Sequence, residues 1–365
     1  MKILPRDLSR RMKVFFNEIY NGIYIFIELK RYRLALFVVA QKFLHIVFNF
    51  DIIPPLPIQV NIEVSSICNL RCPVCPTGAG SLKRTKPLMS YEDFRKIIDE
   101  IKWFSGKVYL HNYGEPFLNK DLLKMIAYAK DAGFYVKLST NGEFFHSREY
   151  ARTFVNSGVD YLFVSVDGKD QETHEKYRIG SDFGKVTEGF KFLTDAKKEL
   201  KSSTPIIELQ FLRTKNNEHQ RDQMKDFAEQ LGANVYAERI FGACSGDKEL
   251  AEQYISDDPA STLLRVKESG TIDYAGEYLN YCHWVTAFMV INSDGTVSPC
   301  IEDPFVKHNM GNIHEQSIKD IWKGEEYRKL RAKIKANRKN IPVCSSCSHA
   351  KTESCLWKTE HIISR

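Results

Sequence analysis

Residues 63–76 read Glu63-Val64-Ser65-Ser66-Ile67-Cys68-Asn69-Leu70-Arg71-Cys72-Pro73-Val74-Cys75-Pro76. The three cysteines follow the spacing C-x3-C-x2-C and come directly after residues 59–64, which are expected to form a strand. Three thiolates on one compact loop can bind three irons of a [4Fe–4S] cube, and such clusters normally take four cysteine ligands. The missing fourth thiolate would leave one iron open to a small molecule. A zinc knuckle, or three unrelated buried cysteines, is the alternative for these residues.

Downstream of this loop, short apolar runs alternate with amphipathic segments. The expected strands are 59–64, 108–110, 134–138, 161–166, 206–212 and 234–238, and the expected helices are 91–101, 121–132, 149–157, 183–200 and 219–231. Ser90 is expected to cap the first helix, and Gly133 to end the second. The alternation indicates an α/β fold in which helical crossovers join parallel strands. In such a sheet the ligand is expected beyond the C-terminal ends of the strands.

The loop from Cys68 to Cys75 resembles the signature of the radical S-adenosylmethionine (SAM) superfamily. The resemblance implies a partial (β/α)6 TIM-like barrel over residues 58–240, whose open iron is chelated by the amino and carboxylate groups of SAM. One-electron reduction then cleaves SAM to methionine and a 5′-deoxyadenosyl radical, which removes a hydrogen atom from the substrate. The protein's task is to orient cofactor and substrate and to exclude side reactions.

Further motifs follow the later strands in the order that this family shows. Tyr113-Gly114-Glu115-Pro116 resembles the GGEP motif, with Tyr113 where the first glycine usually stands. The resemblance implies that Gly114 lets the backbone approach the SAM amino group and that Glu115 helps to accept it.

Ser139-Thr140-Asn141-Gly142 and Ser165-Val166-Asp167-Gly168 resemble family segments that reach the SAM ribose and carboxylate. Arg178 resembles the arginine that often pairs with the SAM carboxylate. The resemblance thus implies catalytic roles for Glu115 and Arg178. The implied cofactor-binding residues are Tyr113, Gly114, Glu115, Pro116, Ser139, Asn141, Ser165, Asp167 and Arg178. Alone, Asn-Gly and Asp-Gly pairs are common turns, so their order along the chain carries the argument.

A second array of cysteines, Cys282-x17-Cys300-x43-Cys344-x2-Cys347, lies near the C-terminus. Asp294-Gly295 predicts a hairpin turn between 288–292 and 297–298, which would carry Cys300 back toward Cys282. One helix is expected over 317–337. Four cysteines can hold a complete iron–sulfur cluster or a zinc ion, and composition alone does not separate the two.

The array resembles the SPASM appendage of radical SAM enzymes, and more closely its shortened "twitch" form. The resemblance implies one auxiliary [4Fe–4S] cluster in a domain over 281–358, after a linker over 241–280. The implied ligands are Cys282, Cys300, Cys344 and Cys347. Cys355 is either a replacement ligand or an ordinary thiol, and Cys244 is either a loop thiol or a substrate-facing residue.

Residues 1–52 lie outside the resemblance and are rich in large apolar residues interrupted by Lys30, Arg31, Arg33 and Lys42. The uninterrupted apolar runs are shorter than the ~20 residues that a membrane span needs. A helical N-terminal extension is expected, which either packs on the main domain, contacts a membrane surface or binds a partner. The net charge is +6, without a block of like charges that would indicate a nucleic-acid partner. The start of the chain does not resemble a secretory signal, so the clustered cysteines favour metal binding in a cytoplasmic protein, with membrane association as the alternative.

The resemblance implies an oxygen-sensitive, anaerobic oxidoreductase or maturase that takes electrons from a donor such as flavodoxin or ferredoxin. After hydrogen abstraction, the substrate radical would lose a proton and pass an electron to the auxiliary cluster. The twitch-like spacing resembles that of an aminocyclitol alcohol dehydrogenase, which favours a small hydroxylated or sugar-like substrate. A peptide-modifying SPASM maturase is the alternative, and a non-catalytic metal-binding protein is an alternative from another class.

Overall fold

The computed structural model describes residues 53–240, 252–256, 264–266, 272–274, 277–345, 347, 350 and 358–363, together with residues 32, 35, 36, 39 and 40. The rest of the expected N-terminal extension 1–52, most of the linker 241–280, Cys244 and Cys355 lie outside the described residues. Within the described part of the chain, no helix is long and apolar enough to cross a membrane.

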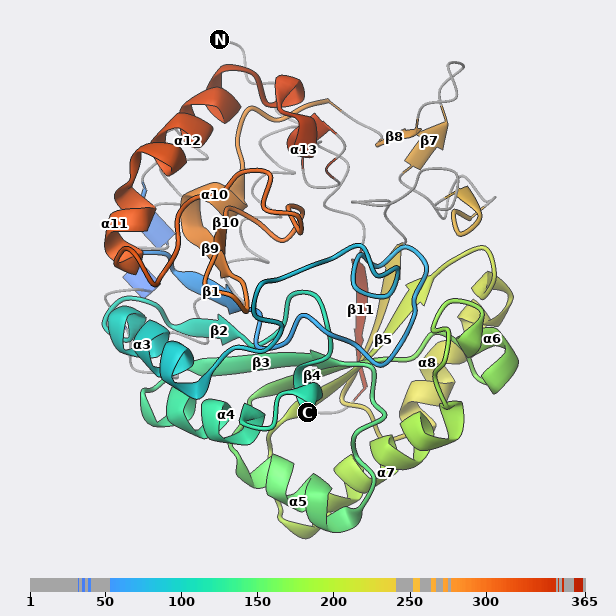
Figure 1. Ribbon diagram of the computed structural model, residues 1–365. Helices are drawn as coiled ribbons and strands as arrows, with labels where there is room; N and C mark the ends of the chain where they lie inside the picture. Colours follow the sequence, from blue (N-terminus) through green and yellow to red (C-terminus); the bar gives the residue numbers. More distant parts are fainter. Residues whose placement is uncertain are drawn as a thin grey trace.

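A nine-stranded sheet with the order β10-β9-β1-β2-β3-β4-β5-β6-β11 forms the centre of the molecule (Figure 1). The first six strands in the chain are β1 (Gln59–Ile62), β2 (Lys107–Tyr109), β3 (Tyr135–Thr140), β4 (Tyr161–Ser165), β5 (Ile206–Arg213) and β6 (Val235–Ile240). Each of them pairs in parallel with the next. The sheet does not close on itself, because β10 and β11 form its two edges. The expected α/β fold with a partial TIM-like barrel is therefore confirmed.

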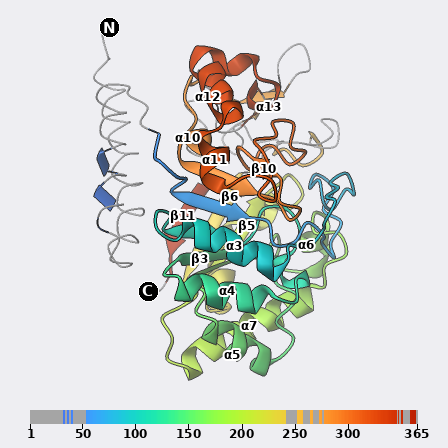
Figure 2. The ribbon, with the colours of Figure 1, turned by 60° about the vertical axis from the view of Figure 1, so that its left-hand side comes forward.

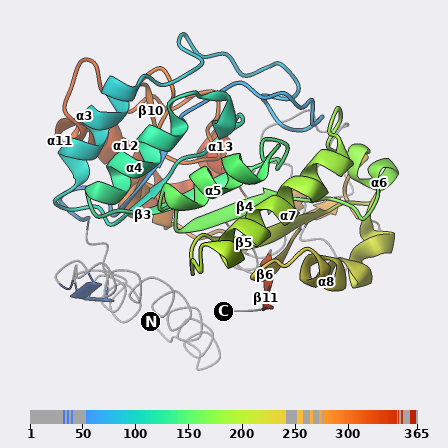
Figure 3. The same ribbon diagram turned by 90° about the horizontal axis from the view of Figure 1, so that it is seen from below.

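Helices cover one face of this sheet, and Figure 3 shows α3, α4, α5 and α7 side by side across it. The helices of the barrel are α3 (Tyr91–Ile101), α4 (Leu122–Asp131), α5 (Arg148–Asn156), α6 (Gln171–Glu175), α7 (Phe183–Glu199) and α8 (Arg221–Gln230). As expected, Ser90 caps α3, with its hydroxyl accepting a hydrogen bond from the Asp93 amide at 3.1 Å. Alternate strand residues such as Val108 and Leu138 are fully buried in the core formed with these helices. The intervening strand residues therefore face the opposite, inner side of the sheet.

The elements of residues 283–345 gather at the β10 edge of the sheet, where Figure 2 shows α10, α11, α12 and α13 close together. This C-terminal region consists of α10 (His283–Ala287), β9 (Phe288–Ile291), β10 (Val297–Ser298), α11 (Ile318–Lys323), α12 (Glu325–Asn337) and α13 (Pro342–Ser345). The predicted hairpin is present, and Gly295 takes a left-handed φ of 83° in its turn. The single helix expected over 317–337 is instead two helices, because the chain is extended at Gly324 (ψ 169°).

Pairings at the two edges of the sheet were not expected from the sequence. Strand β9 pairs in parallel with β1, so the C-terminal region continues the sheet of the barrel. On the opposite edge, β11 (Lys358–Ile362) pairs antiparallel with β6. Two short antiparallel strands, β7 (Leu264–Val266) and β8 (Ile272–Tyr274), lie in the segment that was expected to be an irregular linker.

Candidate cofactor and cluster sites

The three cysteines of the first motif lie on one folded loop that follows β1. The backbone at Gly78 packs directly against that of Cys72. A Cβ at residue 78 would lie 2.5 Å from both the backbone nitrogen and the backbone oxygen of Cys72, so only glycine fits there. Burial raises the pKa of Cys68 to about 12 and also raises the pKa of Cys72. Burial thus favours the neutral thiol form of Cys68 and Cys72, and a metal that binds these two sulfurs must displace their protons.

Among the described residues, no three His, Cys, Asp or Glu side chains converge closely enough to hold one metal ion. A [4Fe–4S] cluster places each thiolate on a different iron, so its three thiols stand around a cube rather than at one point. The loop provides a soft donor set of this kind with three thiols and no fourth cysteine beside them among the described residues. Its donors fit a SAM-binding cluster, and the assignment of Cys68, Cys72 and Cys75 as ligands remains our proposal.

Glu115 lies at the point where the ends of β2 and β3 meet the cysteine loop. Gly114 has a φ of 86°, and a Cβ there would lie 2.3 Å from the carbonyl oxygen of Ser65, so only glycine fits. The buried Glu115 carboxylate accepts hydrogen bonds from the Thr140 hydroxyl at 2.9 Å and from the backbone N–H of Asn141 at 2.8 Å. Burial raises the pKa of Glu115 to about 7, although these hydrogen bonds oppose the shift. The structure thus joins the two sequence motifs that hold Glu115 and Asn141.

A chain of polar side chains connects this motif to the cysteine loop. The Asn141 side-chain amide donates to the side-chain oxygen of Asn69 at 2.8 Å, and the Asn69 amide in turn donates to the Glu143 carboxylate. Glu143 also accepts a hydrogen bond from the Ser181 hydroxyl at 3.1 Å. Asn69, Glu143 and Ser181 were not among the site residues expected from the sequence. Only Asn69 carried a signal, because it lies inside the cysteine motif itself.

Arg178 lies beside the cysteine loop and is paired with Asp167. Its Nε donates to the Asp167 carboxylate at 2.6 Å, and its Nη1 lies 4.0 Å from the Cys72 sulfur. Burial lowers the pKa of Arg178, but Asp167 and Cys72 outweigh burial, so its pKa is raised and it stays charged. The other Asp167 carboxylate oxygen accepts the Leu212 amide at 2.8 Å, which joins the ends of β4 and β5.

The remaining residues of the expected SAM site lie near the same end of the sheet. Ser139 and Ser165 are near the ends of β3 and β4, and Pro116 begins the short helical turn 116–118. Contacts from Ser139, Ser165, Asp167 and Arg178 to SAM remain predictions.

The four C-terminal cysteines expected as auxiliary ligands line one cavity: Cys282, Cys300, Cys344 and Cys347. Burial raises the pKa of Cys300 and Cys344. The His308 Nε2 atom is buried and has no hydrogen-bond partner among the described residues, and its ring also lines this cavity. A full set of four thiols around one cavity fits a cluster held entirely by protein ligands.

Arg338 is a buried residue of this cavity that the sequence analysis did not identify. Its Nη2 lies 3.7 Å from the Cys347 sulfur, and its Nη1 donates to the Tyr281 carbonyl oxygen at 2.7 Å. A guanidinium in this position favours the charged thiolate form of the cysteines. In the sequence it stands among the lysines and arginines of 329–339, which gives it no distinguishing signal.

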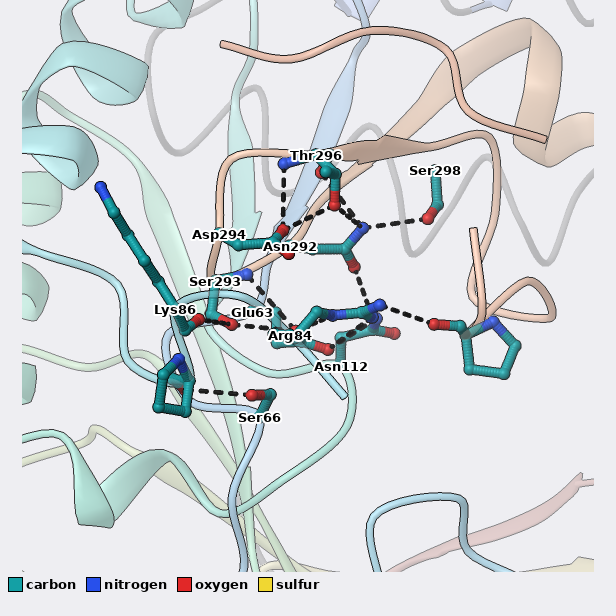
Figure 4. Close-up of polar contacts among 12 residues, drawn as sticks. Glu63, Ser66, Arg84, Lys86, Asn112, Asn292, Ser293, Asp294, Thr296 and Ser298 are labelled. Carbon is teal, nitrogen blue, oxygen red and sulfur yellow. Dashed lines mark hydrogen bonds and ion pairs between the residues drawn. The ribbon is translucent and has the colours of Figure 1, made fainter. Parts of the chain in front are cut away.

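Arg84 joins the end of β1, which leads into the first cysteine loop, to the C-terminal region through buried contacts (Figure 4). Its guanidinium lies 2.8 Å from the Glu63 carboxylate, and the two side chains are 3% and 0% exposed. It also donates to the Asn292 side chain at 2.9 Å and to the Pro304 carbonyl oxygen at 2.8 Å. Glu63 directly follows β1, Asn292 directly follows β9, and Pro304 comes four residues after Cys300.

A second connection starts from the SAM motif. The Tyr113 hydroxyl donates to the Ile301 carbonyl oxygen at 3.0 Å. Tyr113 stands where the GGEP pattern usually has glycine, and Ile301 directly follows Cys300. The residue that departs from the pattern thus links the SAM motif to the loop of an expected auxiliary ligand.

Comparison with known proteins agrees with this geometry. Residues 62–208 match the family model of the radical SAM superfamily, and the chain belongs to that superfamily of enzymes. Residues 282–348 match the SPASM iron–sulfur cluster-binding domain, which makes the chain a SPASM-type member. Its cofactors are accordingly SAM and a SAM-binding [4Fe–4S] cluster, and its SPASM domain binds auxiliary iron–sulfur.

Similar proteins cover most of the chain at low identity. The chain is 25% identical over 325 residues to an AdoMet-dependent heme synthase of Nitratidesulfovibrio vulgaris, with 78% of this chain and 85% of the relative covered. It is 26% identical over 314 residues to the tungsten-containing aldehyde ferredoxin oxidoreductase cofactor-modifying protein of Pyrococcus furiosus (79% and 86% covered). The crystal structure of Streptococcus suis SuiB bound to S-adenosylmethionine has a TM-score of 0.61 at 15% identity (86% and 76% covered), which shows the shared fold.

Replacing Glu115 with glutamine is expected to weaken SAM binding about tenfold, because the shape is kept while the charge that would attract the SAM amino group is lost. The neutral acid attracts that group less than the carboxylate does. Wild-type affinity for SAM should therefore rise as pH increases through about 7, and the Glu115→Gln affinity should not.

Equilibrium dialysis of SAM without reductant measures the dissociation constants of the wild type and of the variant across this pH range. Glu149→Gln, at an exposed position of α5, is the matched control. Equal affinities for the Glu115→Gln variant and the wild type would contradict this role.

Proposed function

We propose that the chain is a radical SAM oxidoreductase or maturase that oxidises a small polar substrate with the help of its auxiliary cluster. When bound, SAM and the two clusters supply a hydrogen-abstracting 5′-deoxyadenosyl radical and an acceptor for one electron. One observation carries the proposal: the SAM motif and the auxiliary loop are in direct contact, through Tyr113 and Ile301. A shared sheet and the buried Arg84 contacts support the same short path between the sites.

The residues around the first site have distinct tasks in this proposal. Cys68, Cys72 and Cys75 hold the SAM-binding cluster, and Cys282, Cys300, Cys344 and Cys347 hold the auxiliary one. Glu115 accepts the SAM amino group, while Asn141 and Asn69 keep that motif against the cysteine loop. Arg178, held by Asp167, presents its positive charge toward the SAM carboxylate and the cluster. Flavodoxin or ferredoxin would provide the electrons.

For the substrate, we propose a small molecule, with the hydroxylated or sugar-like compounds expected from the sequence as one class. Two relatives are named for heme synthesis and for cofactor modification, which supports a small-molecule substrate. A peptide is the alternative substrate.

The experiment is anaerobic reconstitution with iron and sulfide, followed by SAM and a reductant. About eight irons per chain and reductant-dependent release of 5′-deoxyadenosine are expected, since two [4Fe–4S] clusters are held. Fractions of a cell extract separated by size are then added. Faster release with the small-molecule fraction supports the proposed substrate class, and faster release with the peptide fraction supports the alternative. A protein with about eight irons and SAM that releases no 5′-deoxyadenosine under any of these conditions would refute the proposal.

A further inference from the structure

The cavity of the auxiliary cysteines contains a histidine whose role the four thiols do not explain. His308 lines this cavity together with Cys282, Cys300, Cys344 and Cys347. Its side chain is half-buried, but its Nε2 atom is shielded from solvent and makes no hydrogen bond to any residue that the structure describes. A buried polar nitrogen without a partner is costly, so its position at the cavity indicates that the group bound there provides the partner.

The loop from Cys300 to His308 is folded back on itself by one buried carboxylate. Asp303 accepts hydrogen bonds from the backbone N–H groups of Lys307 and His308, both at 2.8 Å. Within this turn Val306 has a φ of 52°, a conformation that is rare for a β-branched residue. The turn brings His308 to the cavity that Cys300 also lines.

The chemistry of the cavity decides which way a hydrogen bond at Nε2 would run. A cluster held by the four thiols presents thiolate and sulfide sulfurs, which carry negative charge. One nitrogen of a neutral imidazole donates a hydrogen bond and the other accepts one. An accepting Nε2 would turn its lone pair toward these sulfurs and be repelled, whereas an Nε2–H group would be attracted. Apolar side chains line much of the remaining cavity, and a medium of this kind strengthens a hydrogen bond: Trp284, Val285, Leu330 and Ile334.

We propose that His308 donates a hydrogen bond from Nε2 to a sulfur of the auxiliary cluster and thereby raises the reduction potential of that cluster. Reduction adds one negative charge, so the hydrogen bond stabilises the reduced form more than the oxidised form. Hydrogen bonds to the sulfurs are among the determinants of the potential of such clusters. A higher potential makes the cluster a better acceptor for the electron of the substrate radical. This inference rests on the proposed function, because it needs a cluster on the four cysteines that accepts an electron.

The loop that carries His308 also contacts the barrel. The Ile301 carbonyl oxygen accepts the Tyr113 hydroxyl at 3.0 Å, and the Pro304 carbonyl oxygen accepts the Arg84 guanidinium at 2.8 Å. Both contacts lie between Cys300 and His308 in the chain. The barrel therefore helps to fix the position of this hydrogen-bond donor.

The test is a potentiometric titration of the reconstituted full chain that carries Cys72→Ala. This chain is expected to hold about four irons, those of the auxiliary cluster. Electron paramagnetic resonance detects the reduced cluster at each potential and needs no turnover. Titration of the chain with Cys72 intact, in which SAM changes the spectrum of the other cluster only, gives the same comparison.

His308→Leu should keep the iron but lower the equilibrium constant for reduction about tenfold, which is ~59 mV for one electron. It removes the donor and keeps most of the volume of the ring. His308→Gln, whose amide N–H group can reach the position of Nε2, should restore most of the potential. His219→Leu is the matched control, because His219 is exposed and does not line the cavity, and it should leave the potential unchanged.

Three results would overturn the proposal. His308→Leu could keep the potential of its parent, or it could lose auxiliary iron, which would make His308 a ligand rather than a donor. His308→Gln could lower the potential as far as His308→Leu does, which would assign the effect to the packing of the ring. A chain whose auxiliary potential depends on His308 but that releases no 5′-deoxyadenosine would refute the proposed function and keep this hydrogen bond.

Discussion

Replacing Cys72 with alanine is expected to abolish reductive cleavage of SAM and to remove about four irons per chain, the content of one [4Fe–4S] cluster. Cys72 is the most buried of the three thiols on its loop, and Arg178 stands beside it. With two thiols left on the loop, the cluster loses a ligand that no other described cysteine nearby can replace. The measurements are iron content and 5′-deoxyadenosine release after anaerobic reconstitution.

Two further variants make this result specific. Cys300→Ala should also lose about four irons but keep slow SAM cleavage, because it removes a ligand of the other site. Cys244→Ser tests whether a thiol outside both assigned ligand sets matters, and it should keep both iron content and cleavage. Retained cleavage in Cys72→Ala would contradict the ligand assignment, and lost cleavage in Cys300→Ala would contradict the separation of the two sites.

The features that could be predicted from the sequence are those with a local pattern. Parallel strands and their crossover helices follow from alternating periodicities, and Ser90 caps α3 as its position before an amphipathic run predicts. The cysteine motifs are equally local, and the structure places each group of expected ligands together. The break between α11 and α12 was missed because glycine is tolerated within a helical pattern, whereas here Gly324 adopts an extended backbone.

Long-range pairings and isolated charges could not be predicted in this way. Strand β9 pairs with β1 across more than two hundred residues, and neither segment carries a local signal for its partner. Arg84 stands in a polar loop where an arginine usually faces solvent, yet it is 3% exposed. Lys137 alternates with apolar residues on β3, a pattern that fits a solvent-facing lysine as well as an inner-face one. Their surroundings come from segments far apart in the chain.

Replacing Arg84 with methionine is expected to destabilise the protein by about 3–5 kcal/mol, because the fully buried Glu63 carboxylate loses the cation that compensates it. The change also removes the hydrogen bonds to Asn292 and to the Pro304 carbonyl oxygen. Both partners belong to the C-terminal region, so we expect the loop after Cys300 to loosen first. Anaerobic denaturant unfolding measures the stability, and amide hydrogen exchange over residues 288–306 measures the loosening.

Arg152→Met is the matched control for that variant. Arg152 pairs with Glu199 at 2.9 Å, but both side chains are at least 40% exposed, and such pairs contribute about 0–1 kcal/mol. The double variant Arg84→Met with Glu63→Leu should recover part of the lost stability, since it leaves no uncompensated charge in the interior. Equal losses of unfolding free energy for Arg84→Met and Arg152→Met, or no recovery in the double variant, would show that the Arg84–Glu63 pair does not hold the barrel and the C-terminal region together. If the pair does hold them together, Arg84→Met should show faster amide exchange after Cys300 and a loss of auxiliary iron, while the iron on the Cys68 loop is retained.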